Sequence, residues 1–122
     1  MASVADYEMD RIQNAWAEND LGTANADWTV TRAARAQHHN VVVKVDASFS
    51  TIDGAGLLTV KFGTVTKGRK YVFGAGALDF SEFGYEDPVA NEAVSATLSA
   101  GGTGILGCIT MTGYTTAVKA GD

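Results

Sequence analysis

The sequence has little of what would cross-link a chain, anchor it in a membrane or attract it to nucleic acid. Its 122 residues include one cysteine, so no internal disulfide can form. Lys and Arg total 9 against 14 Asp and Glu, a net charge of −5, which disfavours a nucleic-acid partner because phosphate binding needs a basic surface. No apolar run approaches the roughly 18 residues of a membrane helix, and no signal-peptide pattern is visible. We therefore expect neither nucleic acid nor membrane as a partner.

The motifs of catalysis and cofactor binding are also missing. The chain has no HExxH, CxxC, P-loop or Gly-x-Ser-x-Gly pattern. Neighbouring residues of a strand point to opposite faces, so His38 and His39 cannot chelate one metal ion side by side. Cys108 lies in an apolar stretch and is expected in the core, and the carboxylates of residues 79–87 are expected in a solvated loop. The sequence predicts no enzyme and no catalytic, cofactor-binding or metal-binding residue.

The first 25 residues form an acidic segment with a helical pattern. Four apolar residues recur at spacings of 4, 3 and 4 and share one stripe of a helix over residues 4–19: Ala5, Met9, Ile12 and Trp16. Gly22 would end this helix. Because a lone helix of about four turns is marginal in water, we interpret residues 1–25 as an arm, helical or extended. Three alternatives stay open: the arm packs on its own domain, docks on a neighbouring subunit, or is disordered.

Residues 26–122 alternate between apolar and polar side chains with a period of two, the pattern of half-buried strands. Turn signals recur every 8–12 residues, and no segment has the length of a crossover helix. This part of the chain is therefore predicted to be one antiparallel β-sandwich of about seven or eight strands, jelly-roll-like or immunoglobulin-like. The expected strands cover residues 27–32, 41–50, 58–62, 70–73, 78–81, 94–99 and 105–112.

Within the sandwich, the alternation also predicts which side chains point inward. The strand of residues 41–50 places Val41, Val43, Val45, Ala47 and Phe49 on one face. A tight connection is expected at Lys67 and Gly68, and Gly107 indicates a bulge or a close backbone approach. The phenylalanines on inward strand positions are expected in the core: Phe49, Phe62, Phe73 and Phe80.

Three stretches of the sandwich resemble small β-sandwich virion proteins of tailed bacteriophages. Residues 41–50 (VVVKVDASFS) are similar to their opening strand, residues 93–104 (AVSATLSAGGTG) to their penultimate strand and glycine turn, and residues 107–115 (GCITMTGYT) to their closing strand. The likeness covers about residues 40–116. It implies a structural virion protein: a capsid decoration or cement protein, often a homotrimer, that binds the major capsid protein on the outer surface of the head and stabilises it. The resemblance carries over no catalytic residues.

The hypothesis for the partner interface follows from the acidic arm. Its apolar stripe lies outside the β pattern, and aromatic side chains are effective anchors for a partner. We therefore expect Met9, Ile12, Trp16 and Trp28 to supply part of the interface with the capsid.

Two other functions stay open from the sequence. A carbohydrate- or receptor-binding module of a phage tail or fibre would use loop aromatics such as Tyr85 together with nearby acids. A small enzyme would use the carboxylates of residues 79–87. The adjacent Arg69 and Lys70 are too few for a nucleic-acid patch.

Overall fold

The computed structural model describes Met9, residues 12–80 and residues 84–118. This part of the chain forms nine strands, and every strand pair in it is antiparallel. The strands are β1 (Ala15–Leu21), β2 (Trp28–Arg32), β3 (His38–Phe49), β4 (Ala55–Phe62), β5 (Val65–Phe73), β6 (Ala75–Asp79), β7 (Tyr85–Glu86), β8 (Val94–Leu98) and β9 (Gly107–Ala117).

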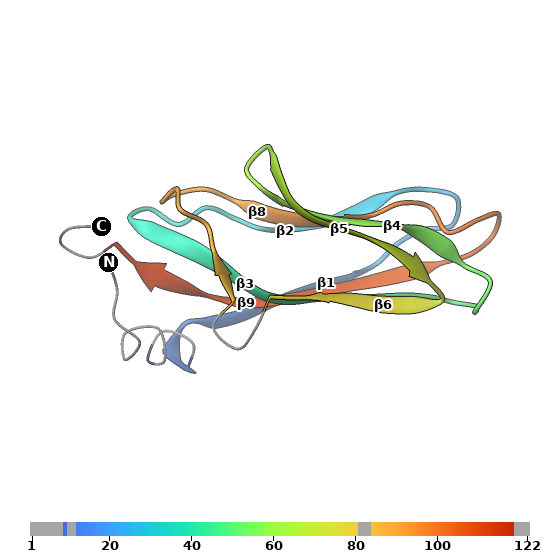
Figure 1. The fold of residues 1–122 in the computed structure, drawn as a ribbon, viewed down its shortest axis with the longest axis horizontal. Coiled ribbons are helices and arrows are strands. Elements are labelled where there is room, and N and C mark those ends of the chain that lie inside the picture. The colour runs from blue at the N-terminus through green and yellow to red at the C-terminus, as the bar shows by residue number, and fades with distance from the viewer. Residues whose placement is uncertain (1–8, 10–11, 81–83, 119–122) are drawn as a thin grey trace.

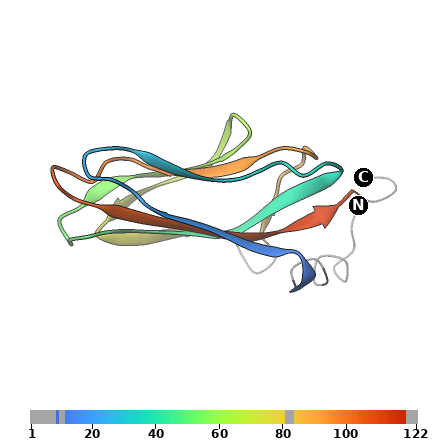
Figure 2. The same ribbon diagram turned by 180° about the vertical axis from the view of Figure 1, so that it is seen from behind.

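The strands form two layers, which Figure 1 shows edge-on and Figure 2 shows from behind. One layer, here the β3 sheet, has the order β1-β9-β3-β6, with the short β7 also paired to β3. The other, the β4 sheet, has the order β2-β8-β4-β5, and the two sheets join where Phe73 pairs with Ala75. Apart from the short β7, the strand order is that of the two four-stranded sheets of a jelly roll. The expected antiparallel β-sandwich is confirmed, and the strand order selects the jelly-roll form.

The core lies between the sheets and is built from alternate residues of the long strands. Val45, Ile109 and Met111 of the β3 sheet pack against side chains of the β4 sheet that are likewise fully buried. Each such side chain contributes about 1.5–3 kcal/mol of hydrophobic stabilisation. The buried members from the β4 sheet are Val30, Leu58, Val60, Phe62, Val72, Val94, Ala96 and Leu98.

The indole ring of Trp28 occupies a slot between two glycines. A Cβ atom on Gly22 or on Gly107 would overlap the ring. The Gly22 amide also donates a hydrogen bond to the Gly107 carbonyl, at 3.1 Å, which holds the two glycines together. The close approach expected at Gly107 is thus present, although its neighbour is an aromatic side chain and not backbone.

The helix expected over residues 4–19 is wrong in its last part, because β1 begins at Ala15. Trp16 and Glu18 lie in this strand, which pairs with β9 over its whole length. A spacing of four residues also fits a strand, and pairing with β9 satisfies the backbone groups that an isolated helix would leave exposed. Residues 1–8, 10 and 11 lie outside the described residues, and the division of the chain at residue 25 stays a prediction.

Three local expectations within the sandwich are also wrong. A register shift between Val42 and Lys44 brings Val42 into the core in place of Val43. The β4–β5 turn lies at Gly63, whose φ is +59°, so β5 runs through Lys67 and Gly68. Val72, not Phe73, is the inward residue of β5, and Phe73 is 74% exposed. Phe49 and Phe62 are buried as expected, and Phe80 packs at the edge of the core.

We predict that Gly107→Ala lowers the free energy of unfolding by about 1–3 kcal/mol, the usual cost of overpacking a filled core. The physical reason is the overlap with the Trp28 ring. The measurement is urea unfolding followed by tryptophan fluorescence. Gly68→Ala is the matched control, because a Cβ atom there would approach its neighbours no closer than 3.5 Å. Equal losses in the two variants would contradict the role of the slot.

Candidate functional site

The structure separates the four residues of the expected partner interface. Met9 and Ile12 are exposed, whereas Trp16 and Trp28 are buried in the domain's own core. The Trp16 ring lies 5.5 Å from the Arg32 guanidinium, which in turn binds Glu18 at 3.1 Å across the β1–β2 side of the sandwich. Of the four, Met9 and Ile12 alone are accessible to a partner, and their interface role stays a hypothesis.

The carboxylates of residues 79–87 do not share one environment. Asp79 is exposed, Glu86 is half-buried on β7, and Asp87 is buried. Glu82 lies outside the described residues. The sequence expectation of a solvated loop therefore fails for Asp87, whose side chain is enclosed.

Asp87 belongs to a polar cluster at the end of the sandwich where β3 begins. Its side chain is 1% exposed, and its Oδ1 accepts a hydrogen bond from the Val89 amide at 2.9 Å. Its backbone carbonyl lies 2.9 Å from Nδ1 of His39, and its amide donates to the Asn40 carbonyl at 2.9 Å. Asp87 Oδ2 has no hydrogen-bond partner among the described residues.

Asn40, which lies on β3, joins the loop after β7 to β9 and to the segment after β2. Its side-chain amide donates to the carbonyls of Glu92, at 3.0 Å, and Ala33, at 3.3 Å. Its side-chain oxygen accepts the hydroxyl of Thr115 at 3.3 Å. These bonds fix the segment after β7 against β3 and β9, so the cluster has a structural role that the sequence did not indicate.

The pKa of Asp87 is raised from 3.8 to about 6, mainly by burial and in part by the neighbouring carboxyl of Glu92, while the Val89 amide and His39 act in the opposite direction. The folded protein thus holds a proton on Asp87 more tightly than the unfolded chain. The tighter proton binding by Asp87 stabilises the folded state. This stabilisation is fully present below pH 3.8 and is lost as the pH rises through about 6.

We predict that Asp87→Asn stabilises the fold by about 1–3 kcal/mol at pH 7, because the amide keeps the acceptor for Val89 and removes a buried charge. Near pH 4 the variant and the parent should melt together. The measurement is thermal unfolding as a function of pH. Asp79→Asn, at an exposed position, should leave the profile unchanged. A lower melting temperature of Asp87→Asn at both pH values would contradict the prediction.

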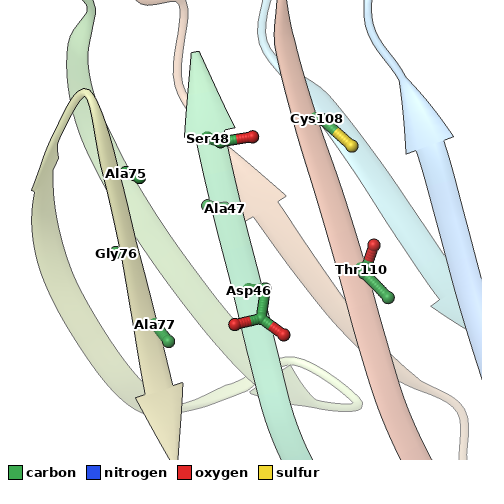
Figure 3. Close-up of a pocket in the computed structure, with 8 residues that line it drawn as sticks. All are labelled: Asp46, Ala47, Ser48, Ala75, Gly76, Ala77, Cys108 and Thr110. Carbon is green, nitrogen blue, oxygen red and sulfur yellow. The ribbon is translucent and has the colours of Figure 1, made fainter. Parts of the chain in front are cut away.

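A shallow hollow of about 460 Å³ lies on the outer face of the β3 sheet, over β6, β3 and β9. Figure 3 shows its small side chains, among them Ser48 and Asp46 on β3, and Cys108 and Thr110 on β9. Cys108 is half-buried on this outer face, so its expected place in the core is wrong. The lining residues offer one carboxylate, which pairs with Lys44 at 3.5 Å, and no base beside the thiol. This arrangement suits contact with another surface better than nucleophilic chemistry.

Large apolar side chains are exposed at the end of the sandwich opposite Asp87. They are Leu21 (77% exposed), Ile52 (90%), Phe73 (74%) and Leu106, and we call them the apolar end. Phe49 lines two hollows among them, one of about 480 Å³ with Ile52 and Phe73 and one of about 260 Å³ with Leu21 and Leu106.

Sequence reasoning missed the apolar end, although a signal was present. Ile52 lies between the strands expected over residues 41–50 and 58–62 and stands two residues before Gly54, so the sequence places it in a turn. The sequence gives no such signal for Leu21 or Leu106. Large apolar residues in turns have no core to enter, so their occurrence there indicates a contact surface.

Within the described ranges, no group of three or more His, Cys, Asp or Glu is placed to hold a metal ion. No helix in these ranges is long and apolar enough to cross a membrane.

Comparison with known proteins yields little. No protein-family model and no curated protein matches the chain. Among solved structures, the arabinose-bound α-L-arabinofuranosidase MgGH51 is similar with a TM-score of 0.44 and 12% sequence identity. The match covers 76% of this chain and 18% of that enzyme's chain. The present chain thus spans less than a fifth of that protein, and a likeness this weak assigns no function.

Proposed function

We propose that this protein is a structural component of a phage virion, a decoration protein that binds the major capsid protein on the outer surface of the head and stabilises it. The proposal combines the sequence resemblance with one structural observation, the apolar end. Four large side chains exposed together at one end of a rigid sandwich make a surface that a partner would cover.

The rest of the molecule is consistent with such a role. A jelly roll with polar outer faces is rigid, and the β1–β2 side is bridged by the ion pair of Arg32 and Glu18. Binding to a capsid through a complementary surface requires no catalytic acid–base pair. The proposal includes self-association into a homotrimer. Such a trimer would bury further surface of each subunit, since cyclic symmetry closes an assembly.

We predict that Ile52→Asp reduces binding to capsid shells of the encoding phage by at least about tenfold, because it places a charge in the centre of an apolar contact. The measurement is co-sedimentation of the purified protein with shells that lack it. Val65→Asp is the matched control, since Val65 is also exposed but lies at the β4–β5 turn, outside the apolar end.

Two results would contradict the proposal. One is full shell occupancy by Ile52→Asp with an unchanged affinity. The other is purified virions that contain none of the protein. Met9→Ala and Ile12→Ala, tested in the same way, decide whether the arm adds to the interface.

A further inference from the structure

A further hollow lies on the outer face of the β4 sheet, away from the apolar end. Its volume is about 260 Å³, and it is lined by Leu57, Thr59, Lys61, Thr66, Arg69 and Thr97. The strand register places Thr59 of β4 between Thr97 of β8 and Arg69 of β5. The Thr97 hydroxyl is hydrogen-bonded to that of Thr29 on β2 at 2.7 Å. The hydroxyl groups of Thr29, Thr97 and Thr59 thus form a row across the sheet that ends beside the Arg69 guanidinium.

The charge of this face is opposite to that of the whole molecule. Residues 54–78 carry four of the nine basic residues and no acidic residue, although the chain has a net charge of −5. Both Lys61 and Arg69 line the hollow, and no carboxylate lines it. Neither cation forms an ion pair with a described residue. The hollow therefore presents two uncompensated positive charges to a ligand.

An exposed aromatic ring stands beside the hollow. Tyr71 is 70% exposed, pairs with Leu57 across the β4–β5 ladder, and lies on the same face of β5 as Arg69, two residues away. A tyrosine ring in this position offers an apolar surface with a polar tip. The C–H face of a sugar ring is a suitable partner for such a surface.

We propose that this face of the β4 sheet binds an acidic saccharide. Arg69 and Lys61 bind its carboxylate, the hydroxyls of Thr59 and Thr97 bind its hydroxyl groups, and Tyr71 covers the face of one sugar ring. Arg69 suits this role because a guanidinium can bind a carboxylate through two parallel hydrogen bonds.

The same charges do not favour nucleic acid. A nucleic-acid backbone is held by several phosphate contacts in a row, whereas two cations line this hollow. A saccharide with one carboxylate per one to three sugars matches both the small number of cations and the row of hydroxyls. Saccharide binding does not require the capsid role proposed above.

The test is NMR titration of the full chain with two acidic oligosaccharides, a tetragalacturonate and a sialyllactose, each against its neutral counterpart. We expect at least one acidic sugar to shift the amide signals of β4, β5 and β8, and its neutral counterpart to bind at least about tenfold more weakly. Arg69→Gln and Tyr71→Ala should each weaken binding by about tenfold or more, roughly 1.4 kcal/mol. Arg35→Gln, a change of the same kind at an exposed residue in the β2–β3 connection, should leave the affinity unchanged.

Three results would overturn the proposal. The first is that neither acidic sugar binds. The second is that Arg69→Gln binds as tightly as the parent. The third is that single-stranded DNA binds this face more tightly than either sugar, which would make it a general anion surface. Because Arg69 and Tyr71 are exposed, their variants should fold, and unchanged spectra elsewhere would verify it.

Discussion

The fit of broad aromatic rings into a thin sandwich is the constraint on which the fold depends. Trp28 fits because Gly22 and Gly107 have no side chains on either side of it. Phe49 is held in the same way at the apolar end, where a Cβ atom on Gly54 or Gly101 would overlap its ring. A sheet spacing of about 10 Å leaves no room for a second side chain opposite an indole.

This packing explains why glycine accumulates from residue 54 onward, where 13 of the 14 glycines lie. Some of these glycines form turns, as the sequence predicts, and Gly63 and Gly74 have the positive φ angles that turns need. Others, such as Gly107, are strand residues whose missing side chain makes space. A single sequence cannot distinguish these two uses of glycine, because both depend on the residue's lack of a Cβ atom.

The period-two alternation of apolar and polar residues predicted the architecture, because each sheet has one face buried in the core and one face exposed to solvent. It predicted the face of individual residues less well. A register shift at Val43 places Val42 in the core instead of Val43. Because both residues are valines, the sequence gives no sign of this shift. Cys108 and Phe73 were assigned inward from their chemistry, yet their neighbours Ile109 and Val72 occupy the inward positions. Apolar character alone cannot decide between adjacent apolar residues.

The candidate sites were less predictable, because each depends on residues far apart in the sequence. Asp87 is buried by contacts with Asn40 and His39, and the basic hollow needs Lys61 and Arg69 on neighbouring strands. The sequence showed Arg69 beside Lys70, but Lys70 donates to the Ala77 carbonyl on another face. Tertiary pairing, rather than adjacency, determines which charges act together.

The pairing of the first strand with the last has a consequence for biosynthesis. β1 has its partner in β9, and the register joins Ala15 to Tyr114 and Leu21 to Cys108. The ribosome must therefore release nearly the whole domain before β1 can find its place, and closing so long a loop slows folding. Until β9 is available, the Trp16 side chain on β1 lacks Gly113, against which it packs in the folded protein. In the nascent chain this large apolar side chain is therefore exposed and accessible to chaperones.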